Sequence, residues 1–208
     1  MNLPMLVAYI VTLIISLTIH EFSHAWAGHA LGDVTAKREG RLTLNPMAHI
    51  DPLFTLALPL LLIIAGSPVV FGAAKPVPFN PYAVRYGKWG AALVAVAGPA
   101  SNLIMAVFVG LYVRFLPLPA IANQFLSLFV VVYLGFFVFN MLPIPPLDGS
   151  RVLYAAMPPA GQDIMDRIEG FGIGGIMLIL FVFYRFFSPL IANAVGALAY
   201  LILGQRVL

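Results

Sequence analysis

The chain has 208 residues, of which 62% are hydrophobic and 9% charged, and its formal net charge at pH 7 is +3. A soluble domain carries about 25% charged residues, so this composition excludes a water-soluble globular domain and indicates an integral membrane protein in a lipid bilayer. The chain has no cysteine, which excludes disulfides and thiolate metal sites. It also has no dense basic run, so no nucleic-acid partner is expected.

The first apolar segment, residues 3–31, is long enough to cross a membrane. At 1.5 Å per residue it would measure roughly 40 Å, against a hydrocarbon core of about 30 Å. Gly32 and Asp33 are predicted to end this helix, and a polar stretch follows over residues 33–51. The sequence therefore opens with one membrane-spanning helix.

The remaining apolar segments vary in length and regularity. Residues 52–65 form a segment of 14 residues with a proline inside it, and a stretch rich in glycine and proline follows. Longer apolar segments are predicted at residues 89–116, 121–142, 171–187 and 190–203. We therefore predict a membrane all-α bundle of about five to six transmembrane helices, with a re-entrant segment or an irregular or β segment near residues 52–80. One domain is expected over residues 1–208, with a core at 3–155 and accessory C-terminal helices at 170–205.

Basic residues concentrate in three connections between these segments, at Lys37, Arg38, Arg41, Lys75, Arg85, Lys88, Arg151 and Arg167. Such an excess is typical of cytoplasmic loops, so all three connections are predicted to face the cytoplasm. The segment near residues 52–74 must then enter the membrane and return on the same side. Irregular backbone at that depth is tolerated where it is buried in protein or lines a wet cavity. An extended stretch between Phe71 and Phe79 could pair with a substrate as an added strand.

Residues 20–24 read H-E-x-x-H within the first predicted span. On a helix, positions four apart lie about 40° apart around the axis, so His20 and His24 face the same way. Two imidazoles at this spacing can occupy two corners of a tetrahedral Zn²⁺ site, and Glu21 beside them can act as a general base. The five-residue pattern can arise by chance, but ionisable side chains inside a membrane span are costly and functional by default.

A zinc site of this kind needs a third protein ligand. His29 lies nine residues after His20 and so about 180° around the helix, which favours an interfacial role. His49 could be a ligand, a proton shuttle or a helix-capping residue, whereas Asp51 is more simply an N-cap. Asp148 follows a proline-rich end of an apolar helix. Asp-Gly is common in turns, but the predicted topology brings Asp148 to the depth of His24 and favours it as the third ligand.

Two asparagines lie within predicted spans. Asn140 is surrounded by apolar residues and could donate a hydrogen bond to a substrate or to a developing oxyanion. It could equally cap a broken helix end. Asn102 follows Gly98 in the stretch G-P-x-x-N and is predicted to form hydrogen bonds between helices, where small residues allow close approach.

The sequence resembles the site-2 protease family of intramembrane zinc metalloproteases, in its compact prokaryotic branch without PDZ or CBS domains. The resemblance covers about residues 10–155 and is carried by H-E-x-x-H, by G-P-x-x-N at Gly98–Asn102 and by FNMLPIPPLDGSR at Phe139–Arg151. It implies that His20, His24 and Asp148 bind one zinc ion, that Glu21 is the general base and that Asn140 helps to hold the substrate. Ser150 stands where the family motif usually has a second glycine.

The function implied by the resemblance is hydrolysis of peptide bonds in or near transmembrane segments of other membrane proteins, in regulated intramembrane proteolysis. The expected partners are a transmembrane protein or peptide substrate and the lipid bilayer. The active site is expected towards the cytoplasmic side of a prokaryotic cell membrane. The alternative is a divalent-metal transporter or metal-binding membrane protein, although the sequence has no inverted repeat that would provide alternating access.

Overall fold

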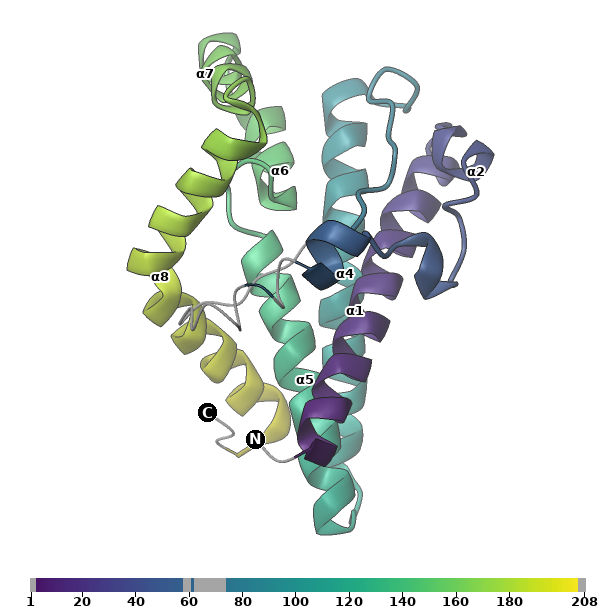
Figure 1. Ribbon diagram of the computed structural model, residues 1–208, viewed down its shortest axis with the longest axis vertical. Coiled ribbons are helices and arrows are strands. Elements are labelled where there is room, and N and C mark those ends of the chain that lie inside the picture. Colours follow the sequence, from purple (N-terminus) through teal and green to yellow (C-terminus); the bar gives the residue numbers. More distant parts are fainter. Residues whose placement is uncertain (1–2, 58–60, 62–73, 206–208) are drawn as a thin grey trace.

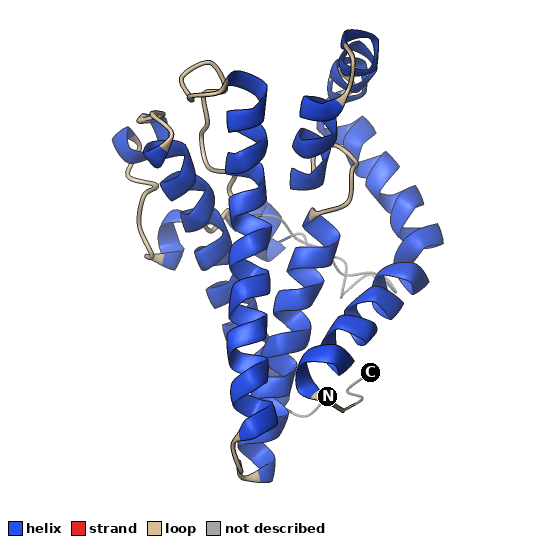
Figure 2. Ribbon diagram, turned by 180° about the vertical axis from the view of Figure 1, so that it is seen from behind, coloured by secondary structure: helices blue, strands red, loops and turns tan. Residues whose placement is uncertain are grey.

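The described part of the protein consists of helices and loops. The structure, a computed structural model, describes residues 3–57, 61 and 74–205, and among them it contains no strand (Figures 1 and 2). The long helices are α1 (Leu3–Ala30), α4 (Gly87–Phe115), α5 (Ala120–Asn140) and α8 (Gly172–Leu203). The short helices are α2 (Thr35–Arg38), η1 (Pro46–Ala48), η2 (Pro52–Ala57), α6 (Asp148–Ala156) and α7 (Pro159–Glu169). The predicted membrane all-α class is confirmed.

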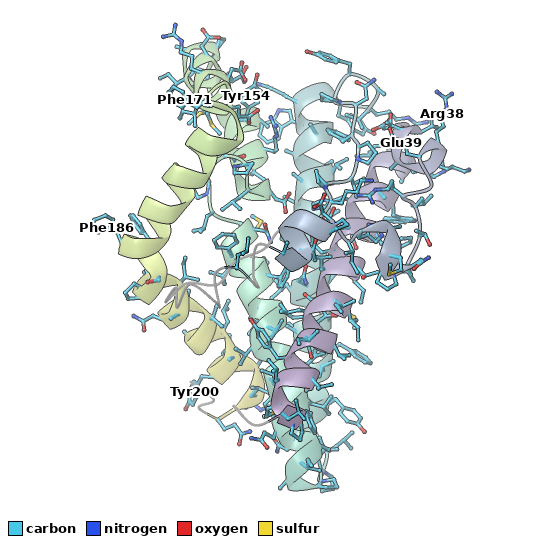
Figure 3. All side chains as sticks on the ribbon, in the orientation of Figure 1. Arg38, Glu39, Tyr154, Phe171, Phe186 and Tyr200 are labelled. Carbon is cyan, nitrogen blue, oxygen red and sulfur yellow. The ribbon has the colours of Figure 1, made fainter. Side chains whose placement is uncertain are left out.

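Among the described residues, four helical segments are long and apolar enough to span a membrane: Leu3–Ala30, Gly87–Phe115, Ala120–Asn140 and Phe186–Leu203. The first three match the predicted segments to within two residues at each end. On the last segment, Phe186 and Tyr200 are 73% and 56% exposed and point away from the bundle (Figure 3). Apolar side chains in this position face lipid in a membrane protein.

The two C-terminal segments predicted at 171–187 and 190–203 form one helix, α8, with Pro189 inside it. The predicted break at Ser188–Pro189 is therefore wrong. A proline removes one backbone donor but keeps a helical φ, and membrane helices tolerate it because neighbouring groups satisfy the freed carbonyl. Helix α4 likewise continues through Pro99.

Helices α1, α4 and α5 pack together. Helix α8 packs against them near its C-terminal end, whereas its N-terminal part lies away from α5 (Figure 1). Buried residues of α4, α5 and α8 form one cluster at that end, including Val130, Tyr133, Leu134 and Ala199. Gly110 allows the close approach, because an added Cβ would lie 2.2 Å from Ile202 Cγ2. This cluster holds together the end of the bundle where both chain termini lie.

At the other end, Asp33 fixes the chain that leaves α1. Its carboxylate is buried and accepts hydrogen bonds from the Thr35 backbone and hydroxyl and from Asn80 N. Burial alone would raise the pKa of this carboxyl, but these hydrogen bonds outweigh burial and lower it. Leu31 O accepts from Arg85 N at 2.9 Å. The end of α1 is thereby tied to the loop that precedes α4, and the predicted helix end at Gly32–Asp33 is confirmed.

A second set of hydrogen bonds joins the two ends of the stretch 50–74. Lys75 N donates to His49 O at 2.9 Å. Arg41 is 5% exposed, and its guanidinium donates to the carbonyl oxygens of Lys75 and Pro76. The chain therefore leaves and returns at the same place in the molecule, as the distribution of basic residues predicts.

Most of the segment predicted as re-entrant or irregular falls on residues 58–60 and 62–73, which lie outside the described residues. Its described parts are the short π-helix η2 and an irregular stretch at residues 74–80. An extended stretch between Phe71 and Phe79 was predicted to pair with a substrate as an added strand. The described part of this stretch, residues 74–79, contains no strand.

Candidate metal centre

His20 and His24 face each other from successive turns of α1. Their Nε2 atoms are 3.0 Å apart, and the two rings are nearly perpendicular, with centroids 4.6 Å apart and an interplanar angle of 87°. His20 is 5% exposed. The helical spacing of four residues therefore places both imidazole nitrogens at one buried point, as the H-E-x-x-H pattern predicts.

Asp148 reaches the same point from the far end of the sequence. Helix α5 ends at Asn140, a proline-containing turn follows, and Asp148 is the first residue of α6. Its Oδ2 lies 3.2 Å from His20 Nε2 and 3.4 Å from His24 Nε2. Burial opposes ionisation of this carboxyl, but the two imidazoles beside it outweigh burial and lower its pKa. Asp148 is therefore a carboxylate at neutral pH.

The backbone around Asp148 requires a glycine beside it. A Cβ on Gly149 would lie 2.2 Å from Met141 O and 2.6 Å from Leu142 O. Gly149 thus lets the start of α6 pack directly against the end of α5, which places Asp148 over α1. Ser150, where the family pattern usually has glycine, is 1% exposed.

The outer nitrogen of each imidazole also has a partner. His24 Nδ1 is 2.8 Å from Val94 O, and His20 Nδ1 is 2.8 Å from Asn102 Oδ1. Because a carbonyl oxygen can only accept, His24 carries a proton on Nδ1, and in the neutral imidazole Nε2 then has a free lone pair directed at the cluster. Metal-binding histidines are commonly oriented in this way.

The three donor atoms fit a zinc ion. Ligand atoms about 2.0–2.1 Å from a tetrahedral zinc are roughly 3.3–3.4 Å from one another, and here the separations are 3.0, 3.2 and 3.4 Å. Asp148 Oδ2 is buried and has no hydrogen-bond partner among the described residues. Two imidazole nitrogens and a carboxylate oxygen are ligands that zinc prefers. Among the described residues, His20, His24 and Asp148 are the group with metal-binding geometry.

Gly98 on α4 makes room for both imidazoles. An added Cβ would lie 2.3 Å from His24 Nε2 and 2.8 Å from His20 Cε1. We therefore expect Gly98→Ala to displace the imidazoles and to weaken zinc binding by at least the 10–100-fold typical of lost orienting contacts. Gly135→Ala is the matched control, because no atom lies within 4 Å of an added Cβ there. Zinc titration of both variants checks this, and equal affinities would contradict it.

The other predicted residues lie around the cluster or away from it. Glu21 is half-buried, and its carboxylate interacts electrostatically with His24. Asn140 lies at the end of α5, where its Nδ2 donates to Phe136 O at 3.0 Å, and Phe136 in turn packs its ring against His20. Their catalytic roles stay predictions.

His29 and His49 do not join the cluster. His49 is completely buried and its Nε2 is 2.8 Å from Thr43 O. His29 Nδ1 is buried in the last turn of α1. Asp51 directly precedes η2, which is the position predicted for an N-cap, and its backbone N donates to Thr55 Oγ1. The structure therefore separates these residues from the three candidate ligands.

Sequence reasoning missed two groups at the site. The carbonyl of Val94 has no side-chain signature, so no motif could have revealed it. Ser16 lies four residues before His20 and bonds to Asn102 at 2.6 Å. Asn102 was predicted to join helices, and it does so, but its other partner is the candidate ligand His20.

Known proteins resemble the chain over most of its length. A Bacillus subtilis protein named "Putative zinc metalloprotease YwhC" is 40% identical over 183 residues, covering 83% of this chain and 79% of that protein. A Mycolicibacterium smegmatis protein named "Putative zinc metalloprotease Rip2" is 33% identical over 185 residues, covering 86% of this chain and 69% of that protein. No family model and no solved structure matches. With these relatives and this cluster, the chain belongs to the site-2 protease family.

Proposed function

We propose that this protein is a zinc-dependent metalloprotease that hydrolyses peptide bonds within the membrane. The observation that carries the proposal is the convergence of His20 Nε2, His24 Nε2 and Asp148 Oδ2 within 3.4 Å of one another. The two relatives are each named a "Putative zinc metalloprotease", which supports the same activity. Glu21, adjacent to the first of these ligands, supplies the base that a hydrolase needs and a simple binding site does not.

His20, His24 and Asp148 would hold the zinc ion, which when bound supplies Lewis acidity to the scissile carbonyl and to the attacking water. Glu21 accepts a proton from that water while the water oxygen forms a bond to the carbonyl carbon. Glu21 then gives the proton to the amide nitrogen as the C–N bond breaks. Asn140 is proposed to donate a hydrogen bond to the substrate. The products are a carboxylic acid and an amine, and Glu21 ends in its starting state.

The substrate class follows from where the site lies. His20 and His24 lie within a membrane-spanning helix, and His20 is almost fully buried. A peptide that reaches them must come from another membrane-spanning segment, and it must unwind because helical amides are hydrogen-bonded to one another. The proposed substrate is thus a transmembrane protein. A cut there releases a soluble portion, which is the step that regulated intramembrane proteolysis uses.

The active site is proposed to lie towards the cytoplasm. His24 lies six residues before the end of α1, so it is about 9 Å from the end that carries α2. The surface at this end is exposed and mainly basic, with Lys37, Arg38, Arg85 and Lys88 (Figure 3 labels Arg38). Basic connections of this kind face the cytoplasm.

One cleavage experiment tests both the reaction and its side. The purified protein in liposomes should cut a single-span test substrate, lose this activity to a zinc chelator and regain it with added Zn²⁺ but not Mg²⁺. In cells, the same substrate tagged on its cytoplasmic part should release that tag into the cytoplasm. Cleavage that survives complete zinc removal would contradict the metalloprotease, and release of only the outer tag would contradict the orientation.

A further inference from the structure

Asn102 and Ser16 form a buried polar pair directly behind His20. Both residues are 0% exposed, and they come from different helices, α4 and α1. Asn102 Nδ2 lies 2.6 Å from Ser16 Oγ and 3.5 Å from Ser16 O, while Asn102 Oδ1 lies 2.8 Å from His20 Nδ1. The three residues thus form one chain of hydrogen bonds inside the spanning bundle, where an unsatisfied polar group is costly.

The backbone carbonyl of Ser16 determines which way the amide points. A carbonyl oxygen only accepts hydrogen bonds, so the end of the Asn102 amide that faces it is the NH₂ group. The opposite end, Oδ1, faces His20 and also only accepts. His20 Nδ1 is therefore the donor and carries the proton. In a neutral imidazole the other nitrogen then has a free lone pair, and this is the Nε2 atom 3.2 Å from Asp148 Oδ2.

We propose that Asn102, oriented by Ser16, is a positioning residue that holds His20 in the tautomer whose Nε2 can bind zinc. This inference rests on the proposed function, because it assigns a role within the same zinc site. It also explains the spacing in G-P-x-x-N. Gly98 and Asn102 lie one turn apart on one face of α4, where the first makes room for the imidazoles and the second orients one of them.

The same register continues along both helices. Val94, one turn before Gly98, offers its carbonyl to His24 Nδ1. Positions 94, 98 and 102 on α4 therefore face positions 24, 20 and 16 on α1 in antiparallel order. Each histidine receives an acceptor from α4 on its outer nitrogen, so both Nε2 atoms are left for a metal ion. A side chain that only joined α1 to α4 would have no effect on the His20 tautomer.

Zinc affinity distinguishes the two roles. Asn102→Leu keeps the volume but removes the acceptor, and we expect zinc to bind 10–100-fold more weakly, as for other lost partners of metal-binding histidines. Asn102→Asp keeps an oxygen acceptor for Nδ1 and should bind zinc about as tightly as wild type. Ser16→Ala should give an intermediate loss. Ser127→Ala is the matched control, because Ser127 is also buried and bonded to an asparagine, Asn123, but lies at the far end of α5.

The His20 tautomer can be read without metal, from the imidazole nitrogen chemical shifts of the metal-free protein. Wild type should carry the proton on Nδ1, and Asn102→Leu should shift it towards Nε2. The inference is overturned if Asn102→Leu binds zinc like wild type, if the Asp and Leu substitutions weaken binding equally, or if wild-type His20 is protonated on Nε2. Failure of the wild type to bind zinc would contradict the proposed function instead, and the tautomer would still decide the role of Asn102.

Discussion

Glu21→Gln is expected to reduce cleavage of a transmembrane substrate by about 10²–10⁴-fold, the range that general acid–base catalysis contributes. Glutamine has the same shape as glutamate but cannot accept a proton from water. Glu21 is not among the three converging donor atoms, so the variant should still bind one zinc ion per chain. The measurement is the initial rate of cleavage in liposomes, with zinc content determined on the same sample.

Glu39→Gln is the matched control, since Glu39 is exposed beyond α2 and far along the chain from the cluster. It should leave both cleavage and zinc content unchanged. Comparison of these two variants also distinguishes a protease from a metal transporter, because a transporter would keep most of its zinc flux without Glu21. A Glu21→Gln protein that cleaves at the wild-type rate would show that another group moves the proton.

Much of the site could be predicted from local patterns. His20 and His24 meet because the helix repeats every 3.6 residues, and that repeat is readable in any sequence. Asp148 could be predicted to lie near them because the distribution of basic residues predicts an even number of crossings between it and α1. The hydrogen bond between Lys75 N and His49 O agrees with that topology. The role of these residues as ligands stays a prediction.

Other features depended on tertiary structure. Pro189 resembles a helix break in the sequence, but α8 continues through it because packing and apolar surroundings favour helix over any irregular backbone in lipid. The link from Ser16 to Asn102 and His20 needs the register between α1 and α4, which no single segment encodes. Val94 takes part through its backbone, so its residue type carries no signal.

The second large effect is expected for Asp148→Ala, which should lose its bound zinc. This substitution removes the carboxylate that lies 3.2 Å and 3.4 Å from the two imidazole nitrogens and leaves two neutral ligands in a buried site. A zinc site of this type uses three protein ligands, so loss of one should leave the ion too weakly bound to survive dialysis against a chelator. Asp163→Ala is the matched control, because Asp163 is exposed on α7.

This zinc measurement tests the central claim directly, namely that residues from the first helix and from position 148 share one ion. Metal analysis of the purified proteins after dialysis should find about one zinc per chain in wild type and in Asp163→Ala. It should find almost none in Asp148→Ala. Full zinc occupancy in Asp148→Ala, with His20 and His24 intact, would contradict the account.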